Sequence, residues 1–464
     1  MQGMQDRVQG QVIPVDRLSL AWSPSLLRPP MQLALLRSQS LVSNICHFSC
    51  ARPSPSRLRS CPLPIGRTGL DSWPGNNPDD SDSDDDAEHS YGFPWHALYG
   101  LKQAGLAWWC TLNESLKELG FEHLKSEAGI FFYKKKGTNI VIGIIYVNDA
   151  LFCGPNKAVV DAIKVQFMCK WECQDLGEPN EFLQMHITHK GCTIHLDQCT
   201  YLQKVVECCG MQNAKTASTP LPAGYYAAKN TEPVDTELCS HFQTVIGSLL
   251  HLMLDTRPDI AFAVTHILHH AMNPSQDHLN KVLYICRYLI GTFTYSLVYN
   301  GGSGAGLIAC TDSDWRSDPI SCLSQTGFYL KLADGLISWT SRVQKTIVYL
   351  STKAEYMALS NYAPQVIWIR SLLGELSYKL NAILICGDNQ GSIFMASNPV
   401  MEPHSKHIDI HYHGICESVT KGKVELFFID GAENPTNLLT KNLPRKRFAK
   451  FRAQLGLQFS SGSI

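Results

Sequence analysis

Cys-x-x-Cys pairs are absent from this sequence, although it has 17 cysteines scattered along 464 residues. Scattered cysteines in an odd number suit neither a zinc knuckle nor a disulfide framework. We therefore expect reduced thiols and an intracellular protein, cytoplasmic or nuclear. Long apolar runs are absent as well: the most apolar stretch, Ile140–Val147, is far shorter than the ~20 residues that a membrane span needs. We expect no membrane contact.

A net excess of positive charge is also missing. The formal net charge is −1, from 40 basic and 41 acidic residues, so charge alone does not predict a nucleic-acid partner. One segment differs, because Lys441–Arg452 has six basic side chains and no acidic one. This composition is typical of a phosphate-facing patch, and a solvated tail helix is the alternative interpretation.

Residues 1–70 contain eight arginines, no lysine and only two acidic residues. A mitochondrial transit peptide has a similar composition, but Pro and Gly interrupt any long amphipathic helix here, which disfavours targeting. An acidic run follows at 79–86, and its charges repel one another and keep the chain extended. We interpret residues 1–89 as a disordered leader with an acidic linker. A leader that binds a partner protein is an alternative.

Periodicity predicts folded structure from about residue 90. The expected elements are a helix at 104–119, a hairpin of Ile130–Lys134 and Ile140–Val147, a tight turn at Asn148-Asp149 and a strand at Leu151–Cys153. Residues 90–235 are therefore predicted to form a first α+β domain, and residues 236–300 a mostly helical region. The glycine-rich segment 301–306 is predicted to be a flexible connector.

After the connector, the predicted elements come in a distinctive order. They are strands at 307–313, 325–332 and 336–342, a helix at 352–376, a strand at 382–388, helices at 390–397 and 406–420, a strand at 423–429 and a short helix at 435–442. Three strands joined by short turns, then alternating helices and strands, predict an α/β fold for residues 306–445. We expect a mixed five-stranded sheet with helices packed on it, followed by a basic C-terminal tail at 446–464.

Three acidic residues lie at the ends of these elements, in line with apolar faces. Asp312 shares a strand face with Ile308 and Cys310. Glu355 lies on the apolar stripe of its helix, and Asp388 ends a strand. Each acid alone is more simply explained as a cap or turn residue. Together, in this element order, the three predict a cluster at one end of the sheet.

Clustered carboxylates cannot stay ionised unless cations balance them. Ligands that offer only oxygen favour Mg²⁺ or Mn²⁺. Two such ions support phosphodiester hydrolysis, because one activates water and the other stabilises the leaving oxygen. The sequence therefore predicts a two-metal site at Asp312, Glu355 and Asp388.

A group of histidines offers a competing site, at His404, His407, His411 and His413. His407 and His411 are four residues apart, a spacing that can bind a metal ion from one helical face. No cysteine or carboxylate completes a zinc set at the usual spacing. Hydrogen-bonding and packing roles are therefore the favoured interpretation.

Several longer motifs carry a family resemblance. They are Thr311-Asp312-Ser313-Asp314-Trp315, Thr326-Gly327-Phe328, Ile337-Ser338-Trp339, Ser351-Thr-Lys-Ala-Glu355-Tyr-Met-Ala-Leu, Gly387-Asp388-Asn389-Gln390 and Lys406-His407-Ile408-Asp409-Ile410. Together they resemble the ribonuclease H domain of copia-type retrotransposon Pol polyproteins. The resemblance implies a ribonuclease H-like fold and places the first three active-site acids of the family at Asp312, Glu355 and Asp388.

The fourth acid of that family lies in an Ala-Asp-x-x-Thr-Lys segment, where this chain has Thr436-Asn437-Leu438-Leu439-Thr440-Lys441. The resemblance makes Asn437 a degenerate fourth ligand, because an amide oxygen can face a cation but brings no charge. It implies weaker binding of one metal ion and reduced hydrolysis. Asp409 lies where the family has its own helical Asp, and it is assigned a structural role.

Upstream motifs resemble the reverse transcriptase of the same family. They are Ala97–Ala104 with Ala107-Trp108, Tyr146-Val147-Asn148-Asp149, Asp175-Leu-Gly177, Phe182-Leu183 and Thr256–Phe262. The family has two aspartates at the hairpin tip and a third on an earlier palm strand. Here Asn148 replaces one, Asp149 remains, and we expect no strand in the leader that matches the third. Gln184 stands where the family usually has Gly.

The resemblance therefore implies a truncated palm at 90–235, a thumb or connection region at 236–300 and loss of DNA synthesis. It implies cleavage of RNA in RNA–DNA hybrids by two Mg²⁺ or Mn²⁺ ions, with recognition of the wide minor groove and the 2′-hydroxyls. The expected nucleic-acid contacts are Lys102, Lys441, Arg445, Lys446 and Arg447. For Lys102, a core or hairpin-support role is an equally strong alternative. The alternative is a non-catalytic nucleic-acid-binding protein or an inert relic, which Asn148 and Asn437 favour.

Overall fold

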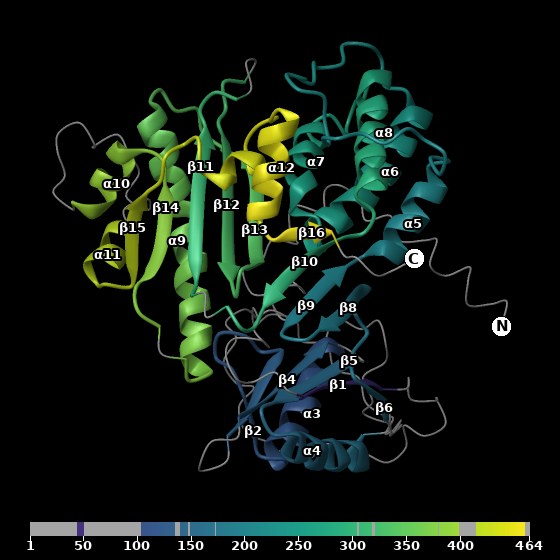
Figure 1. Cartoon of the computed structure of the whole chain (residues 1–464), viewed down its shortest axis with the longest axis vertical. Helices are drawn as coiled ribbons and strands as arrows, with labels where there is room; N and C mark the ends of the chain where they lie inside the picture. The colour runs from purple at the N-terminus through teal and green to yellow at the C-terminus, as the bar shows by residue number, and fades with distance from the viewer. Residues whose placement is uncertain are drawn as a thin grey trace, which may run out of the picture.

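The computed structural model describes residues 44–50, 104–134, 140–146, 149–171, 173–303, 306–317, 321–378, 380–398 and 414–459. Within these ranges the chain forms three β-sheets with helices packed against them (Figure 1). In the described part of the chain, no helix combines the length and apolarity that crossing a bilayer requires.

The first sheet has the strand order β2-β3-β4-β5-β1-β6 and lies at the bottom of Figure 1. Its strands are β1 (Asn44–Cys50), β2 (Phe121–His123), β3 (Ile130–Lys134), β4 (Ile140–Tyr146), β5 (Asp149–Gly154) and β6 (Cys173–Gly177). Helices α3 (Ala104–Glu118) and α4 (Lys157–Lys170) cover one face, where Leu116 and Phe167 pack against Phe152. Alternate residues such as Ile142 and Leu151 join the main core on the other face.

Strand β1 lies in the segment that we predicted to be a disordered leader, so this prediction is wrong for residues 44–50. The strand pairs antiparallel with both β5 and β6, and Ser49 lies opposite Asp149. Its formation depends on two neighbours more than 90 residues away, which local periodicity cannot reveal. The sequence of β1, Asn-Ile-Cys-His-Phe-Ser-Cys, contains no acidic residue.

The second sheet has the strand order β16-β10-β9-β8-β7. Its strands are β7 (Glu181–Phe182), β8 (Met185–Lys190), β9 (Thr193–Asp197), β10 (Tyr295–Asn300) and β16 (Leu457–Phe459). The helices of this region are α5 (Cys199–Cys208), α6 (Thr236–Asp255), η2 (Pro258–Ile260), α7 (Ala261–Leu268) and α8 (Gln276–Gly291). The region 236–300 is therefore mostly helical as predicted, but it ends in strand β10.

The C-terminal tail that we predicted at 446–464 is folded as far as Phe459. Helix α12 (Arg445–Gln454) buries Phe448 and Phe451, and β16 pairs antiparallel with β10. The sequence did not predict a packed helix here, because only two of the ten residues of α12 are large and apolar.

A buried polar network holds α12 against the helical region. Arg257 donates two hydrogen bonds to Asp259, at 2.9 and 2.8 Å, and Tyr288 donates a third at 2.5 Å. Arg452 of α12 then donates to Tyr288 at 3.0 Å and to Tyr295 at 2.8 Å. Burial alone would raise the pKa of Asp259, but the Arg257 guanidinium holds it below its ordinary value.

The third sheet is mixed, with the strand order β13-β12-β11-β14-β15. Its strands are β11 (Ile308–Asp314), β12 (Gln325–Leu332), β13 (Gly335–Val343), β14 (Ile383–Gly387) and β15 (Val424–Phe428). β11, β12 and β13 pair antiparallel, whereas β14 pairs parallel with β11 and with β15. This is the mixed five-stranded sheet that the sequence predicted.

The helices around this sheet are α9 (Ser351–Glu375), α10 (Gln390–Ser397), α11 (Gly414–Thr420) and the 3₁₀ helix η5 (Pro435–Leu439). Long α9 packs on the sheet through buried residues such as Leu359, Val366 and Leu373. The helix predicted at 406–420 begins at Gly414 in the described chain, because residues 399–413 lie outside it. The helix predicted at 435–442 is a shorter 3₁₀ turn.

Candidate metal centre

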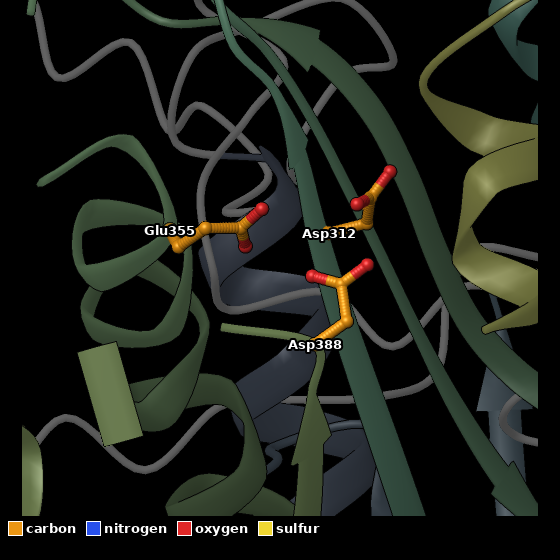
Figure 2. A group of neighbouring side chains, drawn as sticks. All are labelled: Asp312, Glu355 and Asp388. Atoms are coloured by element: carbon orange, nitrogen blue, oxygen red, sulfur yellow. The ribbon is translucent and has the colours of Figure 1, made fainter. Parts of the chain in front are cut away.

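Asp312, Glu355 and Asp388 meet at one end of the adjacent strands β11 and β14 of the third sheet (Figure 2). One carboxylate oxygen from each lies within 4.8 Å of those of the others. Parallel pairing explains how two of them meet, because Cys310 of β11 lies opposite Cys386 of β14. Asp312 and Asp388 each follow these paired cysteines by two residues, so both lie at the same end of the two strands.

Glu355 comes from the first turns of α9, which packs over that end. It is buried, and its Oε1 accepts a hydrogen bond from the backbone N–H of Ser313 at 3.1 Å. The bond links α9 to β11 directly beside Asp312. The carboxylate is therefore held in place before any ligand arrives.

The cluster holds more negative charge than its surroundings can balance. Burial, together with repulsion from Asp312 and Asp388, raises the pKa of Glu355 to about 9. Burial and repulsion from Asp312 raise the pKa of Asp388 to about 6. Lys441 opposes both shifts, and its Nζ lies 3.9 Å from Asp312 Oδ2 and 3.8 Å from Asp314 Oδ1. Bound cations would relieve this repulsion.

Residues around η5 support Asp312, and sequence reasoning missed them. The hydroxyl of Thr440 donates a hydrogen bond to Asp312 Oδ2. Asn434 donates from Nδ2 to the backbone carbonyl of Thr311 at 3.0 Å. Thr440 lies inside the segment 436–441 that the family resemblance marked, and Asn434 lies just before it. The sequence did not reveal which groups these two side chains contact. Asp312 is thus oriented by η5 as well as by its own strand.

Gly327 allows η5 to approach the sheet this closely. It lies opposite Asp312 in the β11–β12 pairing. A Cβ atom at this position would lie 2.8 Å from Thr440 Cγ2 and 3.0 Å from Leu439 Cβ. The glycine is therefore a steric requirement of the Thr440–Asp312 contact.

Asn437, predicted as a degenerate fourth ligand, is buried in η5. Its Nδ2 donates to the carbonyls of Gly431, at 2.7 Å, and Asn434, at 2.8 Å. These two bonds fix the orientation of the amide. Any contribution to a metal ion would have to come from the amide oxygen.

Of the residues predicted for the polymerase remnant, the structure describes Tyr146 and Asp149. Tyr146 and Asp149 are opposite each other at the ends of β4 and β5. Asn148, Lys102 and the four histidines lie outside the described residues. Leu183 and Gln184 have φ values of 51° and 63°, in the left-handed region that favours glycine. This backbone conformation accounts for the glycine that the family usually has at position 184.

The basic residues predicted to contact nucleic acid have different surroundings. Lys441 lies at the acidic cluster, as described above. Arg447 donates to the carbonyl of Gly431 at 2.8 Å, whereas Arg445 and Lys446 are exposed at the start of α12. In the same basic run, Lys450 pairs with Glu433 at 2.6 Å. The run is therefore only partly available to a ligand.

Comparisons with known proteins cover most of the chain. A sequence family described as reverse transcriptase (RNA-dependent DNA polymerase) matches residues 76–223. Two relatives are each 32% identical to this chain over 368 residues. They are the Retrovirus-related Pol polyproteins from transposon TNT 1-94 of Nicotiana tabacum and from transposon RE1 of Arabidopsis thaliana. These matches cover 78% of this chain but only 28% and 24% of the two polyproteins. Among solved structures, LC11-RNase H1 from compost matches 32% of this chain and 91% of its own, at 16% identity and a TM-score of 0.21.

Proposed function

Because this chain belongs to the family of copia-type retrotransposon Pol polyproteins, we propose that it cleaves the RNA strand of RNA–DNA hybrids and does not synthesise DNA. The chain combines a reverse transcriptase domain with a ribonuclease H-like fold. The single observation that carries the proposal is the group of three carboxylates at the edge of that fold.

Divalent cations fit the donor set. The group offers oxygen ligands alone, which suit Mg²⁺ or Mn²⁺. The raised pKa values of Glu355 and Asp388 have mutual repulsion among their causes, so the site is short of positive charge. When bound, two ions would activate a water molecule and stabilise the leaving oxygen. Asp312, Glu355 and Asp388 would hold them, and Asn437 would act as a weakened fourth ligand.

The surrounding residues have distinct roles in this proposal. Thr440 and the Ser313 N–H orient Asp312 and Glu355, so these ligands lose little freedom when a cation binds. Glu355 holds a proton near neutral pH and must release it when an ion binds. The ammonium group of Lys441 lies near Asp312. It could pair with a phosphate of the substrate once cations have neutralised Asp312.

Loss of polymerase activity rests on the palm carboxylates. Polymerisation needs several of them to hold two metal ions. The hairpin keeps Asp149, has Asn148 in place of its neighbour, and the adjacent strand β1 contains no acidic residue. We also propose the predicted division into a palm remnant at 90–235, a connection region at 236–300 and a ribonuclease H-like domain at 306–445.

A hybrid-cleavage assay on the full chain tests the proposal. Wild type should cleave an RNA–DNA hybrid with Mg²⁺ or Mn²⁺, and Asp388→Asn should lose this activity. Glu433→Gln is the matched control, because Glu433 is an exposed acid outside the cluster that pairs with Lys450. Equal cleavage by wild type and Asp388→Asn would contradict the assignment.

A non-catalytic hybrid-binding protein, or an inert relic, is the second candidate. It is favoured by the Asn437 amide, whose nitrogen bonds two backbone carbonyls where the family has an acid. Hybrid binding without cleavage in either metal would select the binder. Neither binding nor cleavage by a folded chain would select the relic.

A further inference from the structure

The loop at 344–350, between β13 and α9, exposes three large apolar side chains. Ile347, Tyr349 and Leu350 are 55%, 89% and 57% exposed. Between them, Val348 is buried against Ala354 and Met357 of α9. The buried valine anchors the loop, so its neighbours are turned outward by a fixed backbone. A gathering of exposed apolar side chains of this kind indicates a contact surface.

Trp315 extends this surface towards the acidic cluster. It follows Asp314 at the end of β11, is 40% exposed, and donates from Nε1 to the carbonyl of Val348 at 3.0 Å. That bond joins the tryptophan to the loop. We call Trp315, Ile347, Tyr349 and Leu350 the aromatic rim. Trp315 directly follows β11, which carries Asp312, and the loop directly precedes α9, which carries Glu355.

Basic side chains accompany the aromatic rim. The guanidinium of Arg316 lies over the Trp315 ring, 5.5 Å from its centroid. Arg342 and Lys345 are exposed on the strand end and the loop, and residues 342–354 include no acidic residue. Aromatic faces with interspersed cations suit a nucleic-acid strand, since cations contact phosphates and rings contact sugars or bases.

The acidic cluster and the partly occupied basic run leave a role for such a contact. Its carboxylates repel a polyanion, and the basic run of α12 is partly occupied, because Lys450 pairs with Glu433 and Arg452 is bound to Tyr288 and Tyr295. Other surfaces beside the cluster can therefore add affinity for a hybrid. The aromatic rim adjoins the elements that carry the cluster, and the neighbouring Arg316 and Lys345 supply positive charge.

We propose that the aromatic rim, with Arg316 and Lys345, is a second nucleic-acid contact that holds a strand of the RNA–DNA hybrid next to the acidic cluster. This inference rests on the proposed substrate of the cluster. It concerns binding, so it can be measured separately from cleavage.

The test measures binding of a labelled RNA–DNA hybrid by fluorescence anisotropy, using the full chain with Asp388→Asn to prevent cleavage. Adding Tyr349→Ala should weaken binding about tenfold, and Tyr349→Phe should restore it, because stacking needs only the ring. Replacing Arg316 and Lys345 with alanine should lower the slope of log affinity against log salt by about two.

Matched controls come from α5 and from the turn between α7 and α8, which lie outside the third sheet. Met272→Ala removes an apolar side chain that is 69% exposed, and Lys204→Ala removes an exposed cation of α5. Neither should change affinity by more than about twofold, the ordinary scale for a distant surface site. Circular dichroism and the thermal midpoint of each variant show whether it folds.

Three outcomes separate the aromatic rim from the catalytic assignment. Unchanged affinity and salt slope in the rim variants, with cleavage intact in wild type, overturns the rim alone. Rim-dependent binding by a chain that cleaves nothing supports the rim and overturns catalysis. Rim variants that change sedimentation but not hybrid binding would make this surface a protein interface and overturn the inference.

Discussion

Thr440 donates its hydroxyl hydrogen to the carboxylate of Asp312, across 128 positions of the sequence. The bond connects η5 to the strand that carries the first acid of the cluster. Lys441, the next residue, lies near both Asp312 and Asp314. A short segment from a distant part of the chain therefore controls both the orientation and the charge of this carboxylate.

Thr440→Val should weaken metal binding, because it removes the donor that orients Asp312. We expect a loss of about tenfold in Mn²⁺ affinity and of about 1 kcal/mol in the free energy of unfolding. Calorimetric titration and thermal unfolding measure the two effects. Thr440→Ser keeps the hydroxyl and should behave like wild type. Equal Mn²⁺ affinity in Thr440→Val and wild type would show that the bond is incidental.

Gly327→Ala should disturb the same contact from the opposite side. The added Cβ would meet Thr440, Leu439 and Thr436 at 2.8 to 3.0 Å. We expect a destabilisation of about 1–3 kcal/mol, typical of overpacking. Gly374→Ala on α9 is the control, since no heavy atom lies within 4 Å of its Cβ position apart from its chain neighbours and the backbone of its own helix. Chemical denaturation compares them, and similar midpoints for both variants would refute the steric argument.

The raised pKa of Glu355 predicts how stability changes with pH. The folded group has a pKa of about 9, against an ordinary value of 4.5, so the folded chain retains a proton that the unfolded chain loses. Its contribution to stability is complete below pH 4.5 and is lost as the pH rises towards 9. Without divalent ions, the thermal midpoint should therefore fall across this window.

Glu355→Gln should flatten that pH profile, because the amide does not titrate. In wild type, apparent Mg²⁺ affinity should rise by up to about tenfold per pH unit below the pKa of Glu355, since metal binding at this carboxylate releases its one proton. Thermal scans in chelator and metal titrations at several pH values measure both trends. A midpoint independent of pH in the chelated wild type would contradict the charge assignment.

Asn437→Asp restores the family's acid but should not restore the site without cost. The substitution removes the Nδ2 group that donates to the carbonyls of Gly431 and Asn434, and leaves a carboxylate oxygen facing them. We expect a loss of at least about 2 kcal/mol without metal, partly recovered with Mn²⁺. Urea denaturation in chelator and in Mn²⁺ measures the change. A more stable metal-free variant would show that this amide orientation is wrong.

Asp259→Asn should destabilise the whole chain, because it leaves Arg257 buried without its counter-charge. The expected loss is about 3–5 kcal/mol. Asp277→Asn, an exposed partner of Lys281, should cost less than about 1 kcal/mol. Equal unfolding midpoints for the two variants would rule out the network as a source of stability.

Local patterns were sufficient to predict much of the third sheet and its acids. Strand parity placed Asp312, and the helical stripe placed Glu355, because burial of one face repeats every two or 3.6 residues. Strand β12 has the predicted bounds, and β11 and β13 differ by about one residue.

Features that depend on distant partners were not predictable in this way. Strand β1 needs β5 and β6, and β16 needs β10, so neither has a local signal strong enough to stand out. Thr440 was part of a recognised motif, but its bond to Asp312 requires the space that Gly327 leaves on another strand.

The pairing of β16 with β10 has a consequence for biosynthesis. Strand β10 is finished more than 150 residues before β16 is translated, and it lies between β9 and β16 in the second sheet. While the third sheet is being made, one edge of β10 remains without this neighbour and open to association with other nascent chains. The second sheet can be completed only after residues 457–459 have left the ribosome.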